Sequence, residues 1–320
     1  MNWVDAQSEI RIYPPEEFSF DECLLFLGRS ELEILHEIKD GCVYKLIVVN
    51  GEFILFKIES IRDFMKVEFL NGIPSEDARQ QVAEYIWEWF ELDMDLRVFY
   101  EWADDDPILS KLTRNYFGLR MICIHDLFEA LVWAILGQQI NLSFAYTLKK
   151  RFVEQFGKSL AVDGDRYWLF PSFEEIASLN VEDLRKLQIT GRKAEYILGI
   201  ANAMSKGGLT KESLMKQDEE QVRKSLLQYK GIGAWTADYV MMKCLHVTTS
   251  FPIGDVGLQN ALKVLLGYDR KPTREEMEEF SAKWEGWQGY AAFYLWRSLY
   301  DETIQTAIPI ANRHNRNTGH

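Results

Sequence analysis

The segment spanning residues 226–259 constrains the fold more than any other part of the chain. From Leu227 to Thr236 it reads Leu-Gln-Tyr-Lys-Gly-Ile-Gly-Ala-Trp-Thr, with Gly231 and Gly233 between two stretches of helical pattern. Glycine takes positive φ without steric cost and leaves main-chain N–H groups uncovered. The second helix adds the positive end of its dipole, so the turn offers amides to an anion such as a DNA phosphate. We therefore predict a helix, a hairpin at residues 226–236 and a second helix.

An aspartate follows this pair of helices. Asp255 ends the sequence Phe-Pro-Ile-Gly-Asp and stands directly before a helix predicted to start at Val256, within a loop of residues 251–258. Such an aspartate can simply cap the helix. Beside a DNA-binding hairpin it can also face the sugar of an extruded nucleotide, where a fixed negative charge stabilises the cation formed as the base departs. Asp255 is therefore the candidate catalytic residue, whereas Asp238, inside the second helix, is predicted to make a structural hydrogen bond.

These motifs resemble the helix-hairpin-helix DNA glycosylases, and among them the AlkA-type 3-methyladenine (alkylpurine) DNA glycosylases. The resemblance runs from about Phe18 to Trp296 and is strongest in residues 128–141 and 226–259. It implies a monofunctional glycosylase of base excision repair that flips out alkylated purines of the 3-methyladenine and 7-methylguanine type and hydrolyses the N-glycosidic bond. Superfamily members that also cut the strand carry a lysine at the position of Trp235, so a lyase step is not expected. The alternatives are a non-catalytic helix-hairpin-helix DNA-binding protein and a glycosylase for oxidised or deaminated bases.

Aromatic residues are the candidates for the base pocket. Trp235 and Tyr239 lie one helical turn apart and project from the same face of the second helix. Aromatic pairs at this spacing also suit a hydrophobic core. The resemblance adds Trp296 and favours a pocket, since electron-rich rings attract a positively charged alkylated base.

The resemblance also assigns roles to the main chain of the hairpin. It implies that the amides of Gly231, Gly233 and Thr236 face a DNA phosphate. It further implies that the carbonyls of Leu227, Tyr229 and Gly231 hold a monovalent cation, sodium or potassium. No cofactor is expected to be required.

A polar loop follows the apolar helix predicted at residues 128–137. Relatives insert a side chain from this loop into the space left by the flipped nucleotide, and the best-known members have leucine where this chain has Gln139. The plugging residue therefore stays open between Gln139 and Ile140, and a plain polar loop is the alternative.

The pattern of the whole chain predicts an α+β protein with an N-terminal antiparallel sheet domain, residues 1–107, and an all-α helix-hairpin-helix domain, residues 108–309. In the first domain, Asn50-Gly51 joins two runs rich in β-forming residues, residues 43–60, which is a strong hairpin signal. Residues 310–320 are expected to form a flexible tail.

Composition limits the class of protein. Residues 1–110 hold 25 acidic and 9 basic residues, whereas residues 111–320 hold 24 and 27, so the net charge of −13 belongs to the first third and does not oppose binding of double-stranded, damaged DNA. No apolar run suits export or a membrane, so we expect a cytoplasmic, nucleoid-associated protein. We also expect a monomer. The four cysteines and five histidines show no metal-ligand spacing, and neither a zinc site nor an iron–sulfur cluster is predicted.

Overall fold

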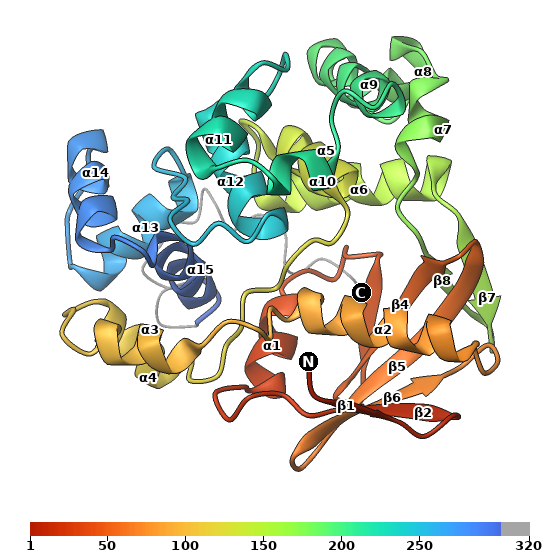
Figure 1. The fold of residues 1–320 in the computed structure, drawn as a ribbon. Coiled ribbons are helices and arrows are strands. Elements are labelled where there is room, and N and C mark those ends of the chain that lie inside the picture. The colour runs from red at the N-terminus through yellow and green to blue at the C-terminus, as the bar shows by residue number, and fades with distance from the viewer. Residues whose placement is uncertain (302–320) are drawn as a thin grey trace, which may run out of the picture.

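The structure is a computed structural model, and residues 1–301 are described (Figure 1). An antiparallel sheet with helices comes first in the chain and a helical domain follows, which confirms the predicted α+β class. The predicted tail, residues 310–320, and the last eight residues of the predicted second domain lie outside the described residues. Among the described helices, none is long and apolar enough to cross a membrane.

The sheet contains six antiparallel strands in the order β1-β2-β6-β5-β4-β3. Asn50 and Gly51 both have positive φ, 52° and 83°, and form the predicted two-residue turn between paired Val49 and Glu52. The strands are β1 (Trp3–Asp5), β2 (Glu9–Ile12), β3 (His36–Lys39), β4 (Cys42–Val49), β5 (Glu52–Ile61) and β6 (Phe64–Phe69).

One face of the sheet is covered by helices, and the other face is covered in part. Helices α1 (Phe20–Leu27) and α2 (Glu76–Trp89) pack on one face (Figure 1). The side chain of Ser75 caps α2 by accepting from the amide of Ala78. On the other face, Tyr167 packs against Leu46 and Leu55. Tyr167 belongs to a hairpin within the helical domain, β7 (Ser159–Val162) and β8 (Asp165–Trp168), which the predicted all-α domain did not include.

A helical core surrounds α5 (Leu127–Gly137), in which nearly every side chain is buried, as its apolar sequence predicts. Helices α6, α9 and α12 contact it directly. The other elements of this domain are α6 (Leu142–Phe156), α7 (Phe173–Ala177), α8 (Val181–Arg185), α9 (Gly191–Ser205), α10 (Lys211–Met215), α11 (Glu219–Leu227) and α12 (Ala234–Cys244).

The C-terminal helices share a core with the N-terminal part of the chain. The ring of Phe99 lies 5.2–5.4 Å from the rings of Trp287, Tyr290 and Tyr294. The predicted boundary at residue 107 lies in an exposed turn between α3 and α4, while the helices on both sides of it contribute to one core. The last helix returns to the helical domain, where the ring of Trp296 lies 6.0 Å from that of Tyr239. These elements are α3 (Leu96–Ala103), α4 (Leu109–Asn115), α13 (Val256–Leu265), α14 (Arg274–Lys283) and α15 (Gln288–Ser298).

Candidate active site

The hairpin joins the end of α11 at Leu227 to the start of α12 at Ala234. Gly233 is the N-cap of α12 and supplies no side-chain cap, and Gly233 and Ala234 are both exposed. The first amides of an α-helix have no partner within the helix. This end of α12 therefore presents N–H groups and the positive end of the helix dipole on the surface.

The two glycine positions of the hairpin differ in whether the structure requires a glycine there. Gly231 has φ of +97°, and a Cβ built there would lie 2.3 Å from Cγ of Tyr196. Gly233 has φ of −92° and ψ of 179°, and a Cβ there would meet no heavy atom within 4 Å. Backbone conformation and close packing require glycine at position 231, whereas position 233 has open space in front of it.

Gln138 ties the loop after α5 to the hairpin. Its Nε2 donates to the carbonyl of Gly231 at 2.9 Å and to Oγ1 of Thr236 at 3.0 Å. Thr236 is 2% exposed, so its hydroxyl is an interior partner rather than a surface group. The sequence indicated only a polar loop here, because a contact between residues about a hundred positions apart leaves no local signal.

Asp255 lies beside the hairpin and caps α13. Its Oδ1 accepts from the amide of Leu258 at 2.8 Å and from Nε1 of Trp296 at 2.9 Å, and its Oδ2 accepts from Nε1 of Trp235 at 2.9 Å. The side chain is half-buried. The carboxylate is therefore held by donors from three separate helices, and the capping role and the position near the hairpin both occur.

Gly257 allows this arrangement, which the sequence analysis did not anticipate. A Cβ at position 257 would lie 2.9 Å from Oδ1 of Asp255 and 3.4 Å from Cδ1 of Trp296. A side chain there would press on both residues. The glycine in Asp-Val-Gly is the signal that could have indicated close packing around the acid.

The three predicted pocket aromatics form one group around Asp255. The ring of Trp235 stacks on that of Tyr239, with centroids 5.6 Å apart and planes 22° apart, and the ring of Tyr239 lies 6.0 Å from that of Trp296. Both tryptophans are half-buried and Tyr239 is buried. Burial raises the pKa of Tyr239 above its usual value, so its ring stays neutral and electron-rich at physiological pH.

Asp238 has the structural role that was predicted for it. It is buried in α12, pairs with Arg223 of α11, and accepts from the hydroxyl of Ser250. Burial raises the pKa of Asp238, and the neighbouring Arg223 guanidinium opposes that rise. The pair fastens the two helices of the hairpin together.

The two residues considered for the plug differ in exposure. Gln139 is exposed and has φ of +56°, an uncommon value for a residue other than glycine. Ile140 is half-buried and packs against the helical core. The loop therefore projects Gln139 outward and anchors itself with Ile140.

Two basic residues of the helical domain, Lys149 and Lys243, do not reach the surface. Lys149 is 6% exposed and pairs with Glu33, and Lys243 is 4% exposed and donates to the carbonyl of Ile122. Lys230, in the hairpin itself, stays exposed. Clusters of basic residues in the sequence thus overstate the positive charge available to DNA.

Solved structures have the same two-part arrangement. A 3-methyladenine DNA glycosylase from Archaeoglobus fulgidus matches 91% of this chain and 97% of its own, with a TM-score of 0.79 and 26% identity. The fold is also that of an 8-oxoguanine glycosylase/lyase from Clostridium acetobutylicum, with a TM-score of 0.76 at 17% identity, over 96% of this chain and 99% of its own. With an aspartate capping the helix beside the hairpin, this fold defines the class of helix-hairpin-helix DNA glycosylases.

Sequence comparisons narrow the class. Residues 132–286 match the model of the HhH-GPD superfamily base excision DNA repair proteins, and residues 13–131 match the N-terminal domain of 8-oxoguanine DNA glycosylase. A DNA-3-methyladenine glycosylase from Bacillus subtilis (strain 168) is 46% identical over 303 residues, which is 94% of this chain and all of the relative. The chain belongs to the HhH-GPD superfamily, in the family of the DNA-3-methyladenine glycosylases.

Proposed function

We propose that this protein is a monofunctional DNA glycosylase that releases alkylated purines, of the 3-methyladenine and 7-methylguanine type, from double-stranded DNA. The single observation that carries the proposal is the carboxylate of Asp255, fixed by the indole N–H groups of Trp235 and Trp296 and by the amide of Leu258. The family of the chain supports the same activity.

The reaction needs a negative charge placed before the bond breaks. Loss of the base leaves positive charge on the sugar, and an oriented carboxylate stabilises that charge without reorganising during the reaction. A carboxylate oxygen has two lone pairs. Oδ1 of Asp255 accepts two hydrogen bonds from described residues and Oδ2 accepts one, so Oδ2 has a lone pair to face the sugar or the attacking water.

Trp235 sets the outcome of the reaction. A strand-cutting glycosylase uses an amine to form a Schiff base with the sugar, and the indole of Trp235 offers only an N–H that is already donated to Asp255. Water is therefore the nucleophile, and the product is an abasic site in an intact strand.

The aromatic group and the hairpin supply binding. The electron-rich faces of Trp235, Tyr239 and Trp296 attract a cationic purine by about 1–2 kcal/mol. The N–H groups at Gly231, Gly233 and Thr236 offer donors to a backbone phosphate without reading sequence. We propose Gln139 as the side chain that fills the gap after flipping, since it is exposed at the tip of its loop.

A monovalent cation would suit the carbonyls at the end of α11. Oxygen donors are the preferred ligands of hard cations. The carbonyl of Tyr229 accepts from the amide of Ile232 at 3.1 Å and that of Gly231 accepts from Gln138, and each carbonyl keeps a second lone pair. With the carbonyl of Leu227, these groups would hold sodium or potassium and add positive charge where the phosphate binds.

The test is base release by an Asp255→Asn variant. Asparagine caps helices about as well as aspartate, so α13 should persist, while the missing charge should lower single-turnover release of 7-methylguanine by about 100-fold or more, with damaged-DNA binding retained. The matched control is Asp218→Asn, which makes the same change at the N-cap of α11, where Asp218 accepts from the amide of Gln221 at 2.8 Å. The control should leave release unchanged.

The choice of substrates separates the proposal from its alternatives. Duplexes carrying 7-methylguanine, 8-oxoguanine or hypoxanthine should be compared, before and after alkali. Release from the methylated duplex, with strand breaks appearing only after alkali, is the expected result. Unchanged release by Asp255→Asn would remove the catalytic assignment, and DNA binding without release of any base would leave only a DNA-binding module.

A further inference from the structure

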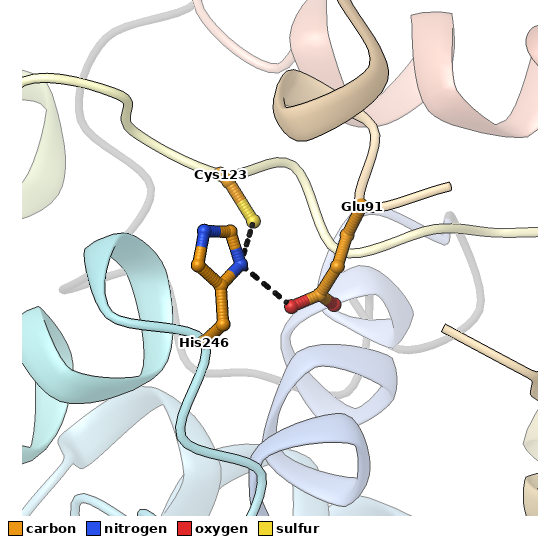
Figure 2. A group of neighbouring side chains, drawn as sticks. All are labelled: Glu91, Cys123 and His246. Atoms are coloured by element: carbon orange, nitrogen blue, oxygen red, sulfur yellow. Dashed lines mark hydrogen bonds and ion pairs between the residues drawn. The ribbon is translucent and has the colours of Figure 1, made fainter. Parts of the chain in front are cut away.

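Three potential metal ligands from separate parts of the chain meet where the sheet domain joins the helical domain (Figure 2). Glu91 follows α2, Cys123 lies in the segment between α4 and α5, and His246 follows α12. Nδ1 of His246 lies 3.0 Å from Oε1 of Glu91 and 3.7 Å from Sγ of Cys123. The three ligand atoms all lie within 4.8 Å of one another.

We propose that Glu91, Cys123 and His246 bind a divalent cation of the zinc class. Zinc takes thiolate at about 2.3 Å and imidazole or carboxylate at about 2.0–2.2 Å in tetrahedral geometry, which places neighbouring ligand atoms about 3.2–3.8 Å apart. The observed distances are close to this range, so small side-chain movements would suffice. A thiolate with an imidazole selects zinc over magnesium or calcium.

Neighbouring residues hold two of these ligands in orientation. Nε2 of His246 lies 3.2 Å from Oε1 of Glu88, which leaves Nδ1 for the metal, and the hydroxyl of Tyr290 donates to Oε2 of Glu91 at 2.5 Å. A carboxylate behind a metal-binding histidine and a donor to a metal-binding carboxylate are typical of zinc sites. Glu91 and Cys123 are 7% and 3% exposed, so both are shielded from competing solvent.

The charges around the site are compatible with a dication. Glu88, Glu91 and a Cys123 thiolate would contribute negative charge, and Lys211 lies 2.5 Å from Glu88 on its outer side. Lys243 and Arg120 are further cations nearby. The amine of Lys243 is turned to the carbonyl of Ile122, and the guanidinium of Arg120 donates to the main-chain carbonyls of Glu17 and Met94. Bound zinc would replace the proton that otherwise lies between the imidazole and Glu91.

A cavity adjoins one of the three proposed ligands. Cys123 lines a cavity of about 60 Å³, together with His125 and Lys243. A cavity of this size with polar walls admits water. A water molecule would complete the tetrahedron, and the metal would fasten the end of α2 to the end of α12, the helix that begins at the hairpin.

Sequence spacing predicted no zinc site because the three ligands lie far apart along the chain. Glu91 and Cys123 are separated by 32 residues, and Cys123 and His246 by 123 residues.

The experiment uses the full chain, stripped with a chelator and then titrated with Zn²⁺ or Co²⁺ alone. We expect one equivalent to bind, a higher unfolding temperature with Zn²⁺, and for Co²⁺ a thiolate charge-transfer band with the visible bands of tetrahedral cobalt. Cys123→Ala should abolish the charge-transfer band. The matched control, Cys42→Ala, changes another buried free cysteine and should leave metal binding unchanged.

A second variant guards against loss of folding. Glu88→Gln keeps all three ligands and should weaken Zn²⁺ binding by about 10–100-fold, the usual effect of removing a partner of a ligand. The proposal is overturned if the stripped protein takes up no stoichiometric metal, if bound Co²⁺ shows no thiolate band, or if Cys123→Ala binds Zn²⁺ as tightly as the unaltered protein. These readouts do not depend on glycosylase activity.

Discussion

Alanine substitutions at the two hairpin glycines should differ in effect: one should lower stability, and the other should weaken DNA binding. Gly231 has φ of +97° and its Cβ position lies 2.3 Å from the ring of Tyr196, whereas Gly233 has an extended backbone and open space at its Cβ position. Gly231→Ala should therefore destabilise the fold. Gly233→Ala should leave the fold nearly unchanged and cover the exposed amides of α12.

The magnitudes follow from separate contributions. At position 231, positive φ costs alanine about 1–2 kcal/mol, and overpacking against Tyr196 adds about 1–3 kcal/mol. The smaller entropy of the unfolded alanine chain offsets about 0.4–1 kcal/mol of this total. A net loss of about 2–4 kcal/mol corresponds to a fall in Tm of roughly 3–6 °C for a protein of this size. At position 233 the same entropy gain and the poorer capping by alanine are each within about 1 kcal/mol and nearly cancel.

The assay pairs thermal unfolding with DNA binding at a temperature where both variants are folded. Gly233→Ala should bind damaged and undamaged duplexes several-fold more weakly, with the same ratio between them, because the hairpin contacts phosphate and not the lesion. Gly231→Ala should unfold at a lower temperature than Gly233→Ala. Equal Tm values for the two variants would refute the role assigned to the conformation of Gly231, and a loss confined to damaged DNA would refute the phosphate role of Gly233.

Three further outcomes are expected. Trp296→Phe keeps an aromatic ring but removes a donor to Asp255. Base release should fall about 10-fold, which is the scale of one hydrogen bond to a charged group, with little change in Tm. An unchanged single-turnover rate would contradict this. Gln139→Ala should weaken binding to damaged duplex without changing stability, measured by fluorescence anisotropy and thermal melting, and equal affinity would count against Gln139 as the plug. Burial alone would raise the pKa of Glu33, but Lys149, 3.0 Å away, outweighs burial and lowers that pKa below its ordinary value of 4.5. Ionised Glu33 therefore stabilises the fold above pH 4.5, and this contribution is lost as the pH falls toward the lowered pKa. Glu33→Gln should cost about 3 kcal/mol at pH 7 in urea unfolding, and the difference from the unaltered protein should shrink in acid; a constant difference would refute the linkage.

Local patterns predicted most of the elements that surround the site. Helices lie on either side of the hairpin as predicted, and Asn50-Gly51 turns as its sequence indicates. These features depend on neighbouring residues, so a single sequence contains their signal. The hairpin β7–β8 carries a local signal of the same kind, because Asp163-Gly164 forms its turn with positive φ at both residues, 52° and 90°. The prediction of an all-α domain missed this signal.

The site was predictable to the extent that motifs carried it. Trp235, Tyr239 and Asp255 belong to one motif, and Trp296 to a second, and the fold brings all four together. Distant contacts had no such signal. The hydrogen bond from Gln138 to the hairpin depends on the packing of α5 against α12, so the sequence alone does not indicate it.

The burial of Lys149 shows why charge along the chain is a poor guide to DNA contacts. In the sequence it stands in Lys-Lys-Arg, which indicates a basic helix face. In the fold its amine lies between the domains and pairs with Glu33. A buried carboxylate without a partner would cost several kcal/mol, whereas one more exposed cation adds little to stability. We therefore expect the main-chain N–H groups at the start of α12 to contribute to DNA binding alongside the basic side chains that stay exposed, such as Lys230. A protein that binds in this way can remain acidic overall and still hold a phosphate.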